Sequence, residues 1–272
     1  MHKTLLAAFV TLSFVGVTPR AARAQLEVLS PSVIERAASP GASYVSTILL
    51  RNSSRTPQAV RIYQEDYRFY ADGRSVFTPA GSHARSNAGW ISLPSSQVVL
   101  QAGETYELAA SVAVPSDSQR VGSYWSLVLI EPVVAAATSD IDAKAPNGTS
   151  SIVTRVRQAI QLVTHIAETG KHDARIGEPR LTSDAAGRRE VRVLIENTGE
   201  RAYRPQISLD ILAADGRTVF THKQERGLIY PGTSIDQLFD LTSLKGGEYA
   251  LLLVVDTGSA DMFGARYRLR LQ

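Results

Sequence analysis

The sequence contains no cysteine. Disulfide bonds, zinc sites with thiolate ligands and lipid attachment at a cysteine are therefore excluded, and stability must come from buried cores and sheet pairing. Long apolar runs are missing after Val17, where no stretch reaches the roughly 20 apolar residues of a membrane-spanning helix. Catalytic signatures are missing too: there is no GxSxG, no P-loop and no HExxH.

The first 24 residues have the pattern of a secretory signal peptide. The basic start MHK precedes an apolar run from Thr4 to Val17, and residues 22–24 match an A-x-A cleavage site. The alternative is a membrane anchor, but this run is shorter than the roughly 20 residues that a spanning helix needs. We expect a periplasmic or secreted protein without stable membrane insertion once residues 1–24 are removed.

Surplus charge is absent from the rest of the chain. Of 29 basic residues, Lys3, Arg20 and Arg23 lie in the signal segment, which has no acid, so residues 25–272 carry 26 basic and 26 acidic residues. A nucleic-acid partner needs a basic surplus or stripe, and the sequence shows neither. We therefore expect no nucleic-acid partner.

Strand patterns dominate the sequence after the signal. Short segments alternate or run apolar and then end at Asn, Gly, Pro or Ser, which is typical of β-strands. The clearest are residues 43–52, 58–70, 95–103, 105–115 and 122–132. No later stretch keeps a helical period long enough for a substantial helix, so the sequence predicts an all-β protein.

One nine-residue motif occurs twice. ADGRSVFTP at 71–79 returns as ADGRTVFTH at 214–222, and Asp-Gly between two strands is a strong hairpin signal. An Asn that ends a strand precedes each copy, LQAGET (100–105) and IYPGTS (229–234) follow, and GSYWSLVLIE and GEYALLLVVD come last. The sequence therefore predicts two tandem immunoglobulin-like β-sandwich domains, residues 25–168 and 169–272.

Two irregular segments interrupt the first copy. PAGSHARSNAGW (79–90) is about ten residues longer than its counterpart. Because loops often carry function, its His83 and Arg85 are candidate contacts, although a plain longer connection is the alternative. Residues 134–151 are small and polar, which predicts a flexible loop inside the first domain.

The spaced landmarks of residues 26–132 resemble two families. VLSPSVIERAASPGASYVSTILLRNSS, EDYRFYADG, WISLPSSQVVLQAGETYELAASVAVP and GSYWSLVLIEP are similar to the first domain of PapD-like periplasmic pilus chaperones. They are also similar to the immunoglobulin-like extracellular domains of WxL-interacting proteins. The chaperone resemblance implies a role in pilus assembly, in which a strand is lent to a partner and basic residues hold the partner's terminal carboxylate.

The lent strand would correspond to SIVTRVRQAIQLVTHI, residues 151–166. Its apolar row includes Ile160 and Leu162, which an open edge could offer to another chain. Arg155 and Arg157 face the other way and could grip a carboxylate. The alternative is that the row packs into the first domain and the arginines are solvated. At the family's basic position in the first strand, this sequence has Ser32.

Groups for catalysis do not converge in the sequence. No histidines have helical i, i+4 spacing, and the adjacent Glu65 and Asp66 would point to opposite faces of a strand. A metal between His165 and His172 is the less favoured alternative to exposed linker histidines. We expect no catalytic site, metal or cofactor. The preferred function is binding of another exported or envelope protein, as a chaperone-like factor, and the alternative is an envelope module that binds glycan or peptidoglycan.

Overall fold

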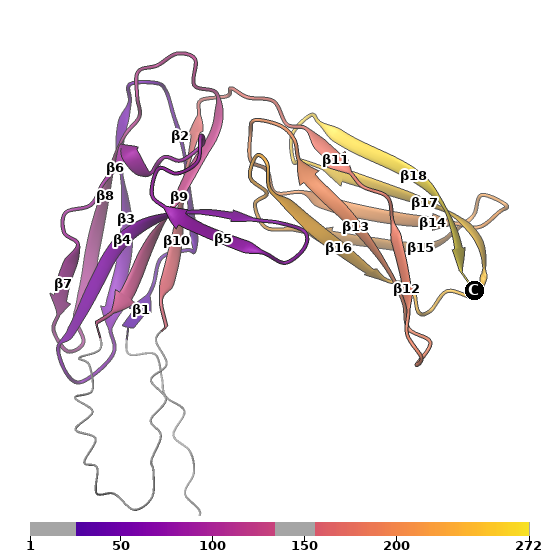
Figure 1. Ribbon diagram of the computed structural model, residues 1–272, viewed down its shortest axis with the longest axis horizontal. Helices are drawn as coiled ribbons and strands as arrows, with labels where there is room; N and C mark the ends of the chain where they lie inside the picture. Colours follow the sequence, from indigo (N-terminus) through magenta and orange to yellow (C-terminus); the bar gives the residue numbers. More distant parts are fainter. Residues whose placement is uncertain (1–25, 134–155, 272) are drawn as a thin grey trace, which may run out of the picture.

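The computed structural model of the chain describes residues 26–133 and 156–271, and it is built almost wholly from β-strands (Figure 1). The predicted signal peptide and the predicted loop at 134–151 lie outside the described residues. No helix in the described ranges has the length and apolar character needed to cross a membrane. The all-β prediction is confirmed.

The strands form two sandwich domains in succession. The first contains β1 (Leu26–Val28), β2 (Val33–Ala38), β3 (Ser43–Asn52), β4 (Gln58–Phe69), β5 (Ser75–Pro79), the short 3-10 helix η1 (Ala88–Trp90), β6 (Ile91–Ser92), β7 (Gln97–Leu100), β8 (Thr105–Ala113), β9 (Gly122–Pro132) and β10 (Gln158–Ile166). The second contains β11 (Ala174–Ile176), β12 (Arg180–Ser183), β13 (Arg189–Asn197), β14 (Gln206–Leu212), β15 (Thr218–Glu225), β16 (Ser234–Asp240), β17 (Gly247–Asp256) and β18 (Met262–Leu271).

Four strand pairings recur in the two domains. The first domain has one sheet in the order β1-β3-β8-β6 and another in the order β2-β10-β9-β4-β5, with β7 also paired to β4. The second has β11 and β12 on one side of β13 with β16 on the other, and a sheet in the order β15-β14-β17-β18. The pairs β3–β8, β4–β5, β4–β9 and β9–β10 thus recur as β13–β16, β14–β15, β14–β17 and β17–β18. The prediction of two tandem immunoglobulin-like sandwiches is confirmed.

The repeated ADGR motif closes the same hairpin in each domain. It joins β4 to β5 and β14 to β15, and its glycines, Gly73 and Gly216, have φ angles of 84° and 83°. In each turn the aspartate accepts a hydrogen bond of 3.0 Å from the backbone N–H two residues on, Asp72 from Arg74 and Asp215 from Arg217. The motif repeats because the left-handed glycine and the aspartate are both required by one turn.

A buried asparagine explains a second pair of landmarks. Asn52 at the end of β3 is fully buried, and its Nδ2 donates to the carbonyl oxygens of Thr56, Leu100 and Gln101 at 2.8, 3.1 and 3.1 Å. The backbone carbonyl of Asn52 accepts a hydrogen bond from the N–H of Gly103. The side chain thereby fastens the LQAG turn to the end of β3.

Asn197 at the end of β13 does the same in the second domain. It is fully buried, and its Nδ2 donates to the carbonyls of Arg201 and Ile229, both at 2.9 Å, while its carbonyl accepts the N–H of Gly232. The IYPG turn is thus held as the LQAG turn is. The landmarks recur in the same order because each buried asparagine donates hydrogen bonds to carbonyl groups at the turn that follows it.

Replacement of Asn52 by alanine is expected to destabilise the protein by about 2 kcal/mol, because buried carbonyl groups lose their donor. Urea unfolding measures this change. As a control, Gln101→Ala on the same turn removes an exposed side chain and should change stability by less than about 0.5 kcal/mol. Equal effects of the two substitutions would contradict the role of the asparagine.

Each sandwich has its own hydrophobic core, and a third cluster lies between them. The first core includes Ile48, Ile130 and Leu162, and the second includes Ile195 and Phe239. The third consists of Trp125, Val163, Ala202, Leu228 and Tyr230, with Val33 and Phe69 packed against it. Strands β2 and β4 and the second domain therefore meet around β9 and β10, where the candidate site lies.

Candidate functional site

Strand β10 is covered along only part of one side. It pairs with β9 from Gln158 to Ile166, but its parallel pairing with β2 begins at Gln161, whose N–H donates to the Ser32 carbonyl at 2.8 Å. Ala159 lies two residues earlier, so its N–H and C=O point to the same side. No described strand pairs there. Within residues 26–133 and 156–271, the start of β10 is therefore an open edge.

Ile160 and Leu162 are not available on this edge. Their exposed fractions are 3% and 2%, and both belong to the core of the first domain. The row packs inward, as in the alternative in which it belongs to the first domain. The sequence alternation identified the row but could not tell which side was covered. Val156, 57% exposed, is the apolar residue left at the open end.

Arg157 reaches back across its own sheet. Its guanidinium lies 3.6 Å from the Glu65 carboxylate, within 3.4 Å of the Tyr63 hydroxyl and 5.1 Å from the centre of the Phe77 ring. It is therefore engaged by neighbouring strands, which departs from the expectation of a free carboxylate grip. Arg155 lies outside the described residues.

The 79–90 loop is anchored by a buried carboxylate. Asp66 is fully buried and accepts hydrogen bonds from the His83 N–H at 3.1 Å and from Ser86 Oγ at 2.6 Å. The His83 ring packs against Trp125 at 4.6 Å between centres, and this burial lowers the pKa of His83. As strand alternation predicts, Asp66 points inward, whereas Glu65 lies with Arg157.

Arg85 fixes the same loop to the start of β9. Its guanidinium donates to the carbonyls of Val121 and Ser123 at 2.9 and 3.4 Å and lies over the Tyr124 ring. His83 and Arg85 thus support the loop structurally, and a role of the loop in contacting a partner stays a prediction.

The junction between the domains is a stack of aromatic rings. Trp125 of β9 lies parallel to Tyr230 of the second domain, with 4.5 Å between ring centres and 11° between ring planes. Phe69 meets Tyr230 edge-on at 6.1 Å, and the Tyr230 hydroxyl donates to Gln161. Burial raises the pKa of Tyr230 far above its ordinary value. Sequence reasoning missed Tyr230, although it lies in the repeated IYPG landmark.

Backbone contacts also join the domains. The N–H of Ser123 donates to the Glu200 carbonyl at 2.9 Å, and the hairpin of β4 and β5 reaches across to the second domain (Figure 1), where the Ala71 N–H donates to Ser234 Oγ at 3.0 Å. Arg201 donates to the linker carbonyls of Ala167 and Thr169. The open edge of β10 is therefore attached to a firmly packed junction.

A polar chain crosses the junction beside the aromatic stack. His165 on β10 bonds Ser123 Oγ through Nδ1 at 2.8 Å and the Glu35 carboxylate through Nε2 at 3.1 Å. Ser123 Oγ accepts the N–H of Ala202 at 2.8 Å, and Arg204 donates to Glu35. These polar contacts connect three strands of the first domain, β2, β9 and β10, with the second domain.

The two junction histidines do not form a shared metal site. His165 bonds Glu35, whereas His172 lies 3.3 Å from Asp261. Within the described ranges, no three side chains of the metal-binding types come together.

Low pH is expected to destabilise the contacts between the domains, because Glu35 becomes protonated. The hydrogen bond from His165, with that from Arg204, lowers the pKa of the Glu35 carboxyl below its ordinary value of 4.5. The ionised form therefore stabilises the folded state above that value, and this contribution is lost as the pH falls through the lower folded pKa. In urea unfolding, the difference between wild type and Glu35→Gln should shrink as the pH falls below 4.5. A pH-independent difference would contradict this.

Neither a protein-family model nor a curated protein matches the sequence. Among solved structures, a chain of a chaperone–tip adhesin complex of CFA/I fimbriae biogenesis is similar, with 13% identity, a TM-score of 0.48 and coverage of 90% of this chain and 98% of that chain. The class 5 fimbriae chaperone CfaA has 12% identity and a TM-score of 0.46 over 89% of this chain and 98% of its own. A chain of the CsuC–CsuE chaperone–tip adhesion subunit complex of Acinetobacter baumannii has 12% identity and a TM-score of 0.42 over 80% and 94%.

Proposed function

We propose that the chain is an exported, non-enzymatic protein that binds an extended segment of another exported protein along the start of β10. The observation that carries this proposal is the open edge at Ala159, next to a β2 pairing that begins only at Gln161. A backbone edge of this kind accepts a further strand through main-chain hydrogen bonds. The role would be that of a periplasmic chaperone-like factor in the assembly of a surface protein.

The fixed junction supports this role. Residues Val163 and His165 on β10 are held by the aromatic cluster and the polar chain, so the strand keeps one position relative to the second domain. A partner strand would then meet an edge that is already ordered, which lowers the entropic cost of binding. The carboxylates of Asp66 and Glu35 are engaged in hydrogen bonds that hold the fold, which fits binding better than catalysis.

Substitution of Ala159 by proline tests the edge. Proline removes only an outward N–H, which edge strands tolerate, yet it blocks strand addition at that residue. Affinity capture from a periplasmic extract should recover the exported partner with wild type, and about fivefold less or lower with Ala159→Pro. Ala159→Val keeps the N–H and is the matched control. Unchanged recovery with the proline variant, when it is folded by circular dichroism, would refute edge pairing.

A further inference from the structure

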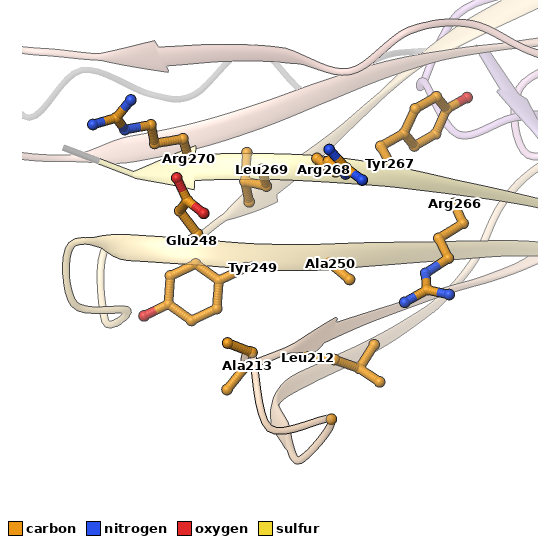
Figure 2. Close-up of a pocket in the computed structure, with 12 residues that line it drawn as sticks. Leu212, Ala213, Glu248, Tyr249, Ala250, Arg266, Tyr267, Arg268, Leu269 and Arg270 are labelled. Atoms are coloured by element: carbon orange, nitrogen blue, oxygen red, sulfur yellow. The ribbon is translucent and has the colours of Figure 1, made fainter.

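Strand β18 carries a row of arginines at the far end of the second domain. Arg266, Arg268 and Arg270 alternate along the strand and are all exposed, whereas Tyr267 and Leu269 between them are half-buried and buried (Figure 2). The row faces a hollow of about 710 Å³ whose lining includes small residues from the 212–216 turn and from β17. Because the strand is pleated, the three guanidinium groups share one face.

These arginines differ from most others of the domain. Most arginines there have an acidic ion-pair partner, namely Arg175, Arg180, Arg188, Arg192, Arg201, Arg204 and Arg217. Among the described residues, no ion pair or hydrogen bond of the three β18 side chains is present. Across the ladder, their partners on β17 are Leu252, Ala250 and Glu248, so only one acid faces the row, beside Arg270 (Figure 2).

No described strand pairs with the other side of β18, since β18 ends the sheet order β15-β14-β17-β18. A second copy of β18 is a poor occupant of this edge, because arginines would lie opposite arginines. A strand with acidic residues at every second position is a good one. Its charges repeat at about 7 Å, the same spacing as the row, since both follow from the rise of a β-strand.

We propose that the β18 edge binds an extended acidic segment of a partner protein, with acids at alternate positions and apolar residues between them. The acids would pair with Arg266, Arg268 and Arg270. The intervening apolar side chains would lie beside Tyr267 and Leu269 and extend the second core. This surface is separate from the β10 edge and goes beyond the function proposed for it.

Labelled peptides test the pairing by fluorescence anisotropy with the full chain at low ionic strength. One nine-residue peptide alternates glutamate and valine, and a second has the same composition with its glutamates adjacent. The alternating peptide should bind more tightly, and the triple variant Arg266→Gln, Arg268→Gln, Arg270→Gln should weaken it about tenfold or more. Arg175→Gln, Arg188→Gln, Arg217→Gln removes equal charge from ion-paired arginines and should leave binding within about twofold.

The outcomes separate the two surfaces. Ala159→Pro should leave binding of the alternating peptide unchanged, so failure of the β10 proposal would not affect this result. Equal binding of both peptides, or equal loss in the two triple variants, would overturn the proposal. Tighter binding of an acidic polygalacturonate oligomer than of the alternating peptide would also overturn it, in favour of a glycan.

Discussion

Replacement of Trp125 by alanine is expected to lower the free energy of unfolding by about 3–5 kcal/mol and to split one unfolding transition into two. The indole is 1% exposed, stacks on Tyr230 and donates from Nε1 to the Tyr67 carbonyl at 2.7 Å. Its loss leaves a cavity between the domains and an unpaired carbonyl. Because each sandwich has its own core, both domains should stay folded but unfold separately.

Differential scanning calorimetry measures both effects. Trp90→Ala is the matched control, because Trp90 is only partly buried and packs on the first core alone. It should weaken the first domain without uncoupling the second. A single transition at the wild-type temperature for Trp125→Ala would show that the ring stack does not couple the domains.

Replacement of Gly122 by alanine is expected to force the domains apart. Gly122 begins β9 with a φ of 77°, and a Cβ added there would lie 2.0 Å from the Glu200 carbonyl oxygen of the second domain. Since that oxygen belongs to the backbone and accepts the Ser123 N–H, it cannot move without loss of the contact. We expect destabilisation of about 2–5 kcal/mol, the sum of backbone strain and overpacking.

Gly73→Ala separates these two causes. Gly73 has a φ of 84°, but a Cβ there would meet nothing within 4 Å. Only the backbone strain of about 1–2 kcal/mol should remain. Small-angle scattering should show a changed domain arrangement for Gly122→Ala alone. Matching stability losses and unchanged scattering in both variants would contradict a steric role for Gly122.

The features predicted from the sequence were those with local signals. Asp-Gly marks a hairpin through the φ of one glycine, and Asn52 and Asn197 recur with the turns they fasten. Period-two alternation also placed Ile160 and Leu162 on one face. These signals depend on neighbouring residues in the chain, so a single sequence reveals them.

The features that were missed depend on contacts between distant residues. Trp125 is buried, but its partner Tyr230 comes from the other domain. Likewise, parallel pairing with β2 covers β10 from Gln161 onward, and no pattern within β10 marks that point. The anchoring of His83 by Asp66 has the same origin, since loop length alone does not show where the loop packs.

Amide hydrogen exchange at Ala159 tests the open edge most directly. In the free protein, the Ala159 N–H should exchange close to its unprotected rate, while the N–H groups of Gln161 and Val163, which face β2, should be strongly protected. Protection of Ala159 equal to that of Gln161 would show that the edge is already occupied, and strand addition at β10 would be ruled out.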